Sequence, residues 1–124
     1  MRFWIMAGVA FALFTASAHA DPVHLECAVA EADGRSPVTF EVTVDETRGV
    51  ASLRIRETGF SILQTPAMFT VRDVSFVNAR ERSSTAYRID RTSLEMTEVI
   101  ERDPGMRTSR SGLCVIPQPG QRQF

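Results

Sequence analysis

The chain has 124 residues, of which 14 are arginine, none is lysine and 15 are acidic, so its formal net charge is −1. A near-neutral chain presents no broad basic surface, and we therefore expect neither a nucleic-acid partner nor attraction to anionic membranes. The absence of lysine excludes Schiff-base and serine–lysine mechanisms.

The first 20 residues have the features of a secretory signal peptide. A positive charge at Arg2 precedes an apolar run from Phe3 to Phe14, and the segment ends in Ala18-His19-Ala20. The run is too short for a transmembrane helix, which needs about 20 apolar residues. We therefore expect a periplasmic or secreted protein with no membrane insertion. Its mature form, residues 21–124, would be a single β domain with a net charge of −2.

The mature chain opens with a predicted strand from His24 to Ala30. Leu25, Cys27 and Val29 alternate there with more polar residues, which is the period of two typical of a half-buried strand. Asp33-Gly34 then predicts a turn.

The clearest element is a hairpin from Val38 to Ile55. Its apolar residues are even-numbered in the first arm and odd-numbered in the second. Both sets reach one face only if Phe40 pairs with Ile55, Val42 with Leu53 and Val44 with Ala51. This register also places Glu41 opposite Arg54. It leaves Glu46-Thr47-Arg48-Gly49 as the loop, in which Gly49 can adopt a positive φ.

The middle of the chain is less regular. Arg56 to Gly59 predicts a break, and a short apolar piece from Phe60 to Leu63 ends before Pro66. From Met68 to Val77 the apolar phase changes at Arg72-Asp73, which indicates a bulge or a turn between two short strands, with Val74 and Phe76 inside. The polar run from Asn78 to Ser83 predicts a loop.

A second hairpin is predicted from Thr85 to Ile100. Tyr87, Ile89 and Met96 would face the core, and Asp90 to Ser93 would form the turn. We expect a long loop from Arg102 to Ser111 and a closing strand from Leu113 to Ile116. Residues 117–124 are expected to form a loose tail.

These elements predict an all-β fold of seven or eight strands, closed as a small antiparallel barrel or sandwich with an outline like that of lipocalins. Cys27 and Cys114 lie near the two ends of the domain. Two cysteines in an exported chain predict a disulfide, which would join the first strand to the last.

Candidate catalytic and metal-binding residues are few. The mature chain has one histidine, His24, close to its N-terminus. Asp45 to Gly49 has some features of a calcium loop but lacks the later bidentate glutamate, so turn formation explains it. A carboxylate pair such as Asp90 with Glu98 could perform acid–base chemistry only if the fold brought the two together. We therefore expect no enzyme activity, no cofactor and no metal.

Several strand and turn residues resemble a pattern in small exported proteobacterial β proteins of unknown function. The matching features are Cys27 in the first strand, the segment Phe40 to Asp45, the turn Ile89-Asp90-Arg91 and Cys114 near the end. Leu94 stands where that pattern has glycine. The resemblance implies a β domain and assigns no activity.

A second resemblance concerns Ser83-Ser84-Thr85-Ala86-Tyr87. It is similar to the Ser-Gly-x-x-Tyr motif of periplasmic c-type lysozyme inhibitors, with Ser84 in place of glycine. Those inhibitors are small disulfide-linked barrels, and the resemblance implies that this loop enters a lysozyme cleft. The alternative is that Tyr87 is a core residue and that Ser83 and Ser84 belong to an ordinary loop.

We therefore predict a non-catalytic binding or interaction module, with c-type lysozyme inhibition as the alternative function. Its partner would be a protein in the periplasm or a host fluid, contacted through the loop from Asn78 to Thr85. The candidate contact residues are Arg80, Arg82, Ser83, Ser84 and Tyr87. A carrier with an open barrel interior is a further possibility, although a barrel of this size has little spare volume. The sequence leaves the oligomeric state open.

Overall fold

The computed structural model describes residues 21–31 and 36–117. The predicted signal peptide, the Asp33-Gly34 turn and most of the predicted tail lie outside these residues. The described chain forms one closed antiparallel barrel in which each strand pairs with the next and the last pairs with the first. The strands are β1 (Val23–Val29), β2 (Val38–Asp45), β3 (Val50–Ile55), β4 (Ser61–Phe69), β5 (Asp73–Ala79), β6 (Ser83–Asp90), β7 (Glu95–Arg102) and β8 (Met106–Val115).

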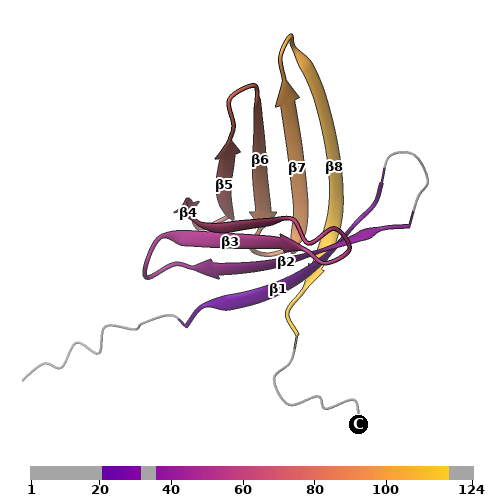
Figure 1. The fold of residues 1–124 in the computed structure, drawn as a ribbon. Coiled ribbons are helices and arrows are strands. Elements are labelled where there is room, and N and C mark those ends of the chain that lie inside the picture. The colour runs from indigo at the N-terminus through magenta and orange to yellow at the C-terminus, as the bar shows by residue number, and fades with distance from the viewer. Residues whose placement is uncertain (1–20, 32–35, 118–124) are drawn as a thin grey trace, which may run out of the picture.

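The barrel has two visibly different halves. In Figure 1, β1 to β4 run across the view, whereas β5 to β8 stand upright. The β5–β6 and β7–β8 turns lie at the upper edge, and the β2–β3 turn lies at the left. The predicted all-β fold is confirmed as a closed barrel of eight strands.

The β2–β3 hairpin has the predicted register. Phe40 pairs with Ile55, Val42 with Leu53 and Val44 with Ala51. All six of these side chains are buried, because alternation puts them on the inner face. On the outer face Arg54 lies 3.5 Å from the Glu41 carboxylate, as predicted. Gly49 closes the turn with a φ of 65°.

Strand β4 departs from the prediction, because it does not end before Pro66. The amide of Ala67 donates to the carbonyl of Gly49, just before β3, and that of Thr70 donates to the carbonyl of Asp73, at the start of β5. Since successive amides point to opposite sides of a strand, the missing N–H of Pro66 falls on the side of β5. The β3 pairing therefore continues through Pro66, whereas the β5 pairing begins only at Ala67.

Two predicted loops are much shorter in the structure. Half of the segment from Asn78 to Ser83 is strand, and only Arg80 to Arg82 form the turn between β5 and β6. The predicted loop from Arg102 to Ser111 is wrong, since β8 begins at Met106 and only three residues, 103–105, separate it from β7. Residues 101–109 are exposed, so no hydrophobic alternation marks them as strand.

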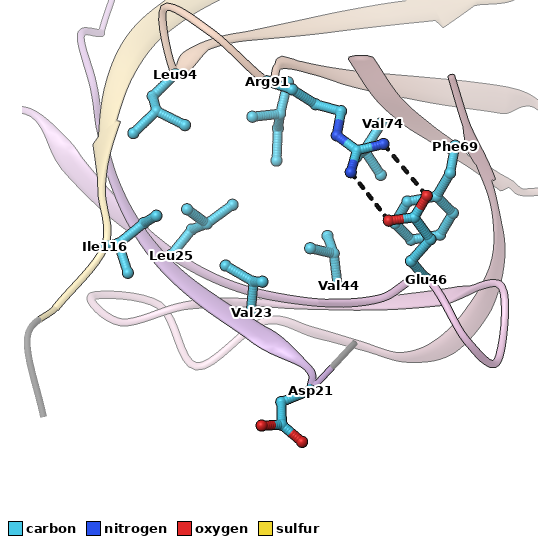
Figure 2. Close-up of a pocket in the computed structure, with 11 residues that line it drawn as sticks. Asp21, Val23, Leu25, Val44, Glu46, Phe69, Val74, Arg91, Leu94 and Ile116 are labelled. Carbon is cyan, nitrogen blue, oxygen red and sulfur yellow. Dashed lines mark hydrogen bonds and ion pairs between the residues drawn. The ribbon is translucent and has the colours of Figure 1, made fainter. Parts of the chain in front are cut away.

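The hydrophobic core fills the barrel unevenly. Strands β1 to β3 contribute nine buried residues and β5 to β8 contribute six, among them Val74, Phe76, Tyr87, Ile89 and Met96, which were all predicted to face inward. One end of the interior opens as an apolar cavity of about 200 Å³ between β1, β2, β5 and β6 (Figure 2). The other end is polar and forms the candidate site.

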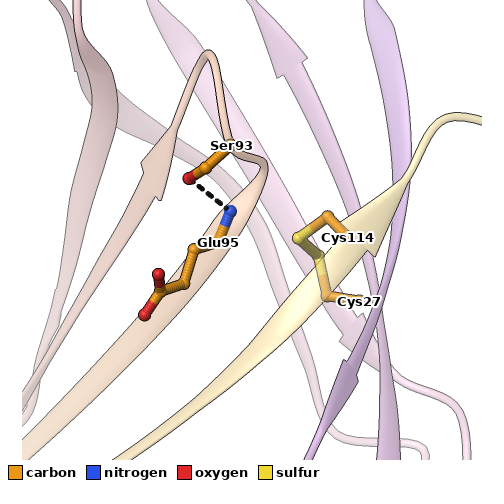
Figure 3. The surroundings of a disulfide bond; sticks show 4 residues. All are labelled: Cys27, Ser93, Glu95 and Cys114. Atoms are coloured by element: carbon orange, nitrogen blue, oxygen red, sulfur yellow. Dashed lines mark hydrogen bonds between the residues drawn. A yellow bond between two sulfur atoms is a disulfide. The ribbon is translucent and has the colours of Figure 1, made fainter.

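The predicted disulfide between Cys27 and Cys114 is present and joins β1 to β8 (Figure 3). Both cysteines are buried, and they are directly opposed in the register. Next to them, the amide of Cys114 donates to the Leu94 carbonyl at 2.8 Å. Leu94 has a φ of 61°, so it adopts the left-handed conformation that glycine would adopt more readily.

Candidate functional site

The candidate site is a cavity of about 210 Å³ at the end of the barrel that carries the β5–β6 and β7–β8 turns. We call it the polar cavity. Its lining residues come from β3, β5, β6, β7, β8 and the adjoining turns, and they are Ile55, Phe60, Asn78, Arg80, Ser83, Thr85, Tyr87, Glu98, Ile100, Arg102 and Arg110.

Strand alternation explains why charged side chains face inward here. On β7, Met96 is a core residue. Glu98 and Arg102 lie two and six residues further along the strand, and an even separation places them on the same face as Met96. On β6, Ser83 and Thr85 share the inner face with Tyr87 in the same way. The interior therefore changes from apolar to polar along each strand toward this end.

Arg110 is the best-connected charge in the cavity. Its Nε donates to the carboxylate of Glu98, and its Nη1 donates to Glu31. The guanidinium also lies 5.1 Å from the centre of the Phe40 ring, within the range of a cation–π contact. Burial lowers the pKa of Arg110, but hydrogen bonds and charges from the two glutamates outweigh it, so the pKa is raised overall. Arg110 is therefore fixed and charge-compensated.

Tyr87 forms the floor of the cavity and is 3% exposed. Its ring stacks on Phe76 with a centroid distance of 5.0 Å and meets the Phe40 ring edge-on at 6.3 Å. Burial raises the pKa of its hydroxyl, and the charge and hydrogen bond of Glu98 raise it further. Tyr87 is consequently a neutral core residue whose hydroxyl faces the polar end.

Arg80 and Arg102 differ from Arg110 in having no carboxylate partner among the described residues. Arg80 lies over the Phe60 ring with its guanidinium carbon 5.0 Å from the ring centre. Arg102 is paired in register with Ser83 across β6 and β7. Within the described residues, neither arginine has a carboxylate partner within ion-pair distance. Two exposed arginines thus lie at the mouth of a cavity whose lining also includes Ser83, Thr85 and Asn78.

Of the five predicted contact residues, the structure brings three to this cavity: Arg80, Ser83 and Tyr87. Arg82 is exposed on the turn between β5 and β6. Ser84 belongs to the opposite face of β6, where it pairs with Glu101. The structure also corrects the expected projection of the loop from Asn78 to Thr85, because the strands hold all but its three turn residues.

Three charged lining residues lay outside the predicted contact loop and were missed as site residues: Glu98, Arg102 and Arg110. Glu98 could have been predicted to face inward, because it is two residues from the core residue Met96 and residues two apart on a strand share a face. Arg102 and Arg110 bounded or lay in a segment interpreted as a loop, where no parity applies.

The two carboxylates considered for acid–base chemistry lie on opposite faces of the barrel wall. Glu98 faces the interior and is 2% exposed, whereas Asp90 is next in sequence to the buried Ile89 and therefore points outward. Asp90 accepts hydrogen bonds from the amides of Ser93 and Thr92, which lower its pKa and identify it as a turn residue. His24 is exposed on β1, and its Nδ1 lies 2.9 Å from the Thr43 hydroxyl.

No cluster of three or more histidine, cysteine, aspartate or glutamate side chains with metal-binding geometry occurs in residues 21–31 and 36–117. The same residues include no helix long and apolar enough to cross a membrane. No family model, curated protein or solved structure matches the chain significantly. The chain is therefore characterised by its fold: a small, closed, eight-stranded antiparallel barrel with a disulfide between its first and last strands.

Proposed function

We propose that this chain is an exported, non-catalytic interaction module that binds an acidic group of a protein partner in its polar cavity. The observation that carries the proposal is the pair of exposed arginines at the mouth of the cavity, Arg80 and Arg102, with no carboxylate partner among the described residues. Arg110 beside them is already compensated by Glu98 and Glu31.

The cavity suits a carboxylate in both charge and size. Guanidinium groups recognise carboxylates through two parallel hydrogen bonds, and a nearby hydroxyl such as that of Ser83 can donate a third. The volume of about 210 Å³ is below the range of about 300 to 1,000 Å³ typical of small-molecule sites. A single aspartate or glutamate side chain from a partner therefore fits better than a larger free ligand.

The scaffold favours binding because it holds these groups in place. Arg102 and Ser83 are on paired strands, and the β5–β6 turn is closed by a hydrogen bond of 2.7 Å from the Arg80 amide to the Ser83 carbonyl. The backbone beneath the two arginines is therefore ordered before binding, and only their side chains have to be immobilised.

Export is supported by two independent features. The predicted signal peptide directs the chain out of the cytoplasm, and the Cys27–Cys114 disulfide is of a kind that persists in oxidising compartments. The proposed partner is accordingly a periplasmic or host-fluid protein with an exposed acidic side chain.

Site-specific photocrosslinking in periplasmic extract tests this proposal. A photoreactive residue replaces Arg82, which is exposed beside the cavity but does not line it, and a matched control replaces Arg54 on the outer wall. We expect one discrete adduct from position 82 that disappears in the Arg80→Ala, Arg102→Ala background and is absent from position 54. No adduct, or equal adducts from both positions, would contradict the proposal.

Inhibition of c-type lysozyme is the second candidate, favoured by the position of Ser83 and Arg80 at the cavity. Glycoside hydrolases of this kind act through two carboxylates, which these residues could engage. The buried Tyr87 would support the loop from inside and would not contact the enzyme. Residual lysozyme activity at micromolar oxidised protein is the measurement, and Ser83→Ala with Arg80→Ala should abolish any inhibition. Unchanged lysozyme activity with the wild-type protein would remove this candidate.

A further inference from the structure

The opposite end of the barrel holds the second interior space, the apolar cavity of about 200 Å³. Eight apolar side chains line it: Val23, Leu25, Val44, Phe69, Val74, Ile89, Leu94 and Ile116. Figure 2 shows several of them converging on a common space, with the side chain of Asp21 directed away from it. Leu25, Val44, Val74 and Ile89 belong to the buried core, so the walls are part of the rigid barrel.

A single ion pair lies at the rim of this cavity. Arg91 Nη2 donates to Glu46 Oε2 at 2.9 Å, and Arg91 Nη1 donates to the Thr70 carbonyl at 2.8 Å. Figure 2 shows the guanidinium and the carboxylate facing each other. Glu46 and Arg91 neutralise each other, and the third charged lining residue, Asp21, directs its carboxylate away from the cavity (Figure 2), so no unpaired charge points into the space.

We propose that the apolar cavity binds a small uncharged apolar molecule, of the size of a benzene ring or a short alkyl chain. The size follows from the volume of the cavity, since an enclosed apolar cavity of about 150 Å³ in another protein holds one benzene molecule. That the ligand is uncharged follows from the Glu46–Arg91 ion pair at the rim. A carboxylate or an ammonium group would have to compete with Glu46 or Arg91 for its partner, whereas an uncharged molecule leaves the ion pair intact.

This site is distinct from the polar cavity in position and chemistry. Its lining residues include none of those that line the polar cavity. The two proposals can therefore fail independently, since binding at one end requires no residue of the other.

Benzene is the test probe, and the readout is the NMR chemical shift of methyl groups in the oxidised protein. We expect saturable shifts at Val23, Leu25, Val44 and Val74, together with a benzene-dependent rise in the thermal midpoint. Val23→Phe should abolish both effects, because Val23 is 38% exposed at the rim and a larger side chain there fills the cavity without overpacking the core. Val77→Phe is the matched control, since Val77 is 50% exposed on β5 and does not line the cavity.

Ile116→Phe provides a second blocking variant if Val23→Phe does not fold, because Ile116 lies beyond the end of β8 and is 53% exposed. Hexanol, hexanoate and hexylamine then test the ligand class, and hexanol should bind at least tenfold more tightly than either charged analogue. The proposal is overturned by shifts that do not saturate, by binding that survives both blocking variants, or by tighter binding of a charged analogue.

Discussion

Arg110 donates a hydrogen bond from Nε to the carboxylate of Glu98, which is 2% exposed at the boundary between the core and the polar cavity. The same guanidinium donates to Glu31, which follows β1 on the neighbouring side of β8. The most buried carboxylate of the cavity is thus paired with a cation that it shares with Glu31.

Removing one partner of the Arg110–Glu98 pair should destabilise the folded protein. Arg110→Met would leave the Glu98 carboxylate buried without its cation, and the expected loss is about 3 to 5 kcal/mol in the free energy of unfolding. The double variant Arg110→Met, Glu98→Leu should recover much of that loss, because it removes both charges. Urea denaturation of the wild type, the single variant and the double variant measures the three free energies of unfolding. A double variant less stable than Arg110→Met would show that the pair is not coupled as described.

Tyr87 is the chain's single tyrosine, so the alkaline tyrosinate absorbance reports on this residue alone. Burial and Glu98 raise the pKa of its hydroxyl in the folded protein, whereas the unfolded value is about 10. The unfolded state therefore releases its proton first, and stability present below about pH 10 should fall as the pH rises further. Spectrophotometric titration should show delayed ionisation that returns to an ordinary midpoint in denaturant. A midpoint near 10 in the folded protein would be inconsistent with this environment.

At position 94 we expect the glycine variant to be more stable than the alanine variant, which is the reverse of the usual order. In ordinary extended structure glycine is less stable than alanine by about 0.5 to 1 kcal/mol, but a positive φ favours glycine. Leu94→Gly and Leu94→Ala both lose the packing of a partly buried leucine, and only the glycine variant relieves the backbone at φ 61°. We expect Leu94→Gly to have the higher thermal midpoint of the two. A higher thermal midpoint for Leu94→Ala would mean that the backbone is not held at this positive φ.

Gly112 sets how closely β8 approaches β1. A Cβ at this position would lie 2.0 Å from the Ala28 carbonyl oxygen, which is a backbone atom and cannot move aside cheaply. Gly112→Ala should therefore destabilise the barrel by about 3 kcal/mol or more. Ser111→Ala, at the neighbouring exposed position, is the control and should have little effect. Equal midpoints for the two variants would contradict the close β1–β8 approach.

Much of the fold could be predicted because one hairpin has an unambiguous pattern. In the segment from Val38 to Ile55, the parity of the apolar residues changes across the loop, and only one register buries both arms. The cysteine positions then indicated which strands close the barrel. The same reasoning correctly oriented Tyr87, Ile89 and Met96.

The remaining strands gave weaker signals for identifiable reasons. Residues 101–109 are solvent-exposed on both faces of the β7–β8 hairpin, so burial leaves no imprint on their sequence. The apolar piece from Phe60 to Leu63 was expected to be short and to be followed by Pro66, whereas β4 continues through Pro66 to Phe69. The missing N–H of Pro66 faces β5, whose pairing begins only at Ala67, so the pairing with β3 is kept. The interpretation of residues 102–111 as a loop concealed the two arginines that β7 and β8 contribute to the polar cavity.

The site itself was only partly predictable. Arg80 and Ser83 were recognised through the composition of a polar segment, whereas Arg102 and Arg110 can be placed at the cavity only once β7 and β8 are known to be strands. Charged residues inside a barrel contradict the simple rule that polar positions face solvent, so pattern reasoning assigns them to the wrong face by default.

The most direct test of the proposed function is a titration of the oxidised, mature protein with a short glutamate-rich peptide, followed by ¹⁵N NMR of the arginine side chains. We predict saturable shifts at Arg80 and Arg102 that weaken as salt is added, with no comparable change at Arg54 on the outer wall. Shifts of equal size at all exposed arginines, or shifts that never saturate, would show that the polar cavity is not a carboxylate-binding site.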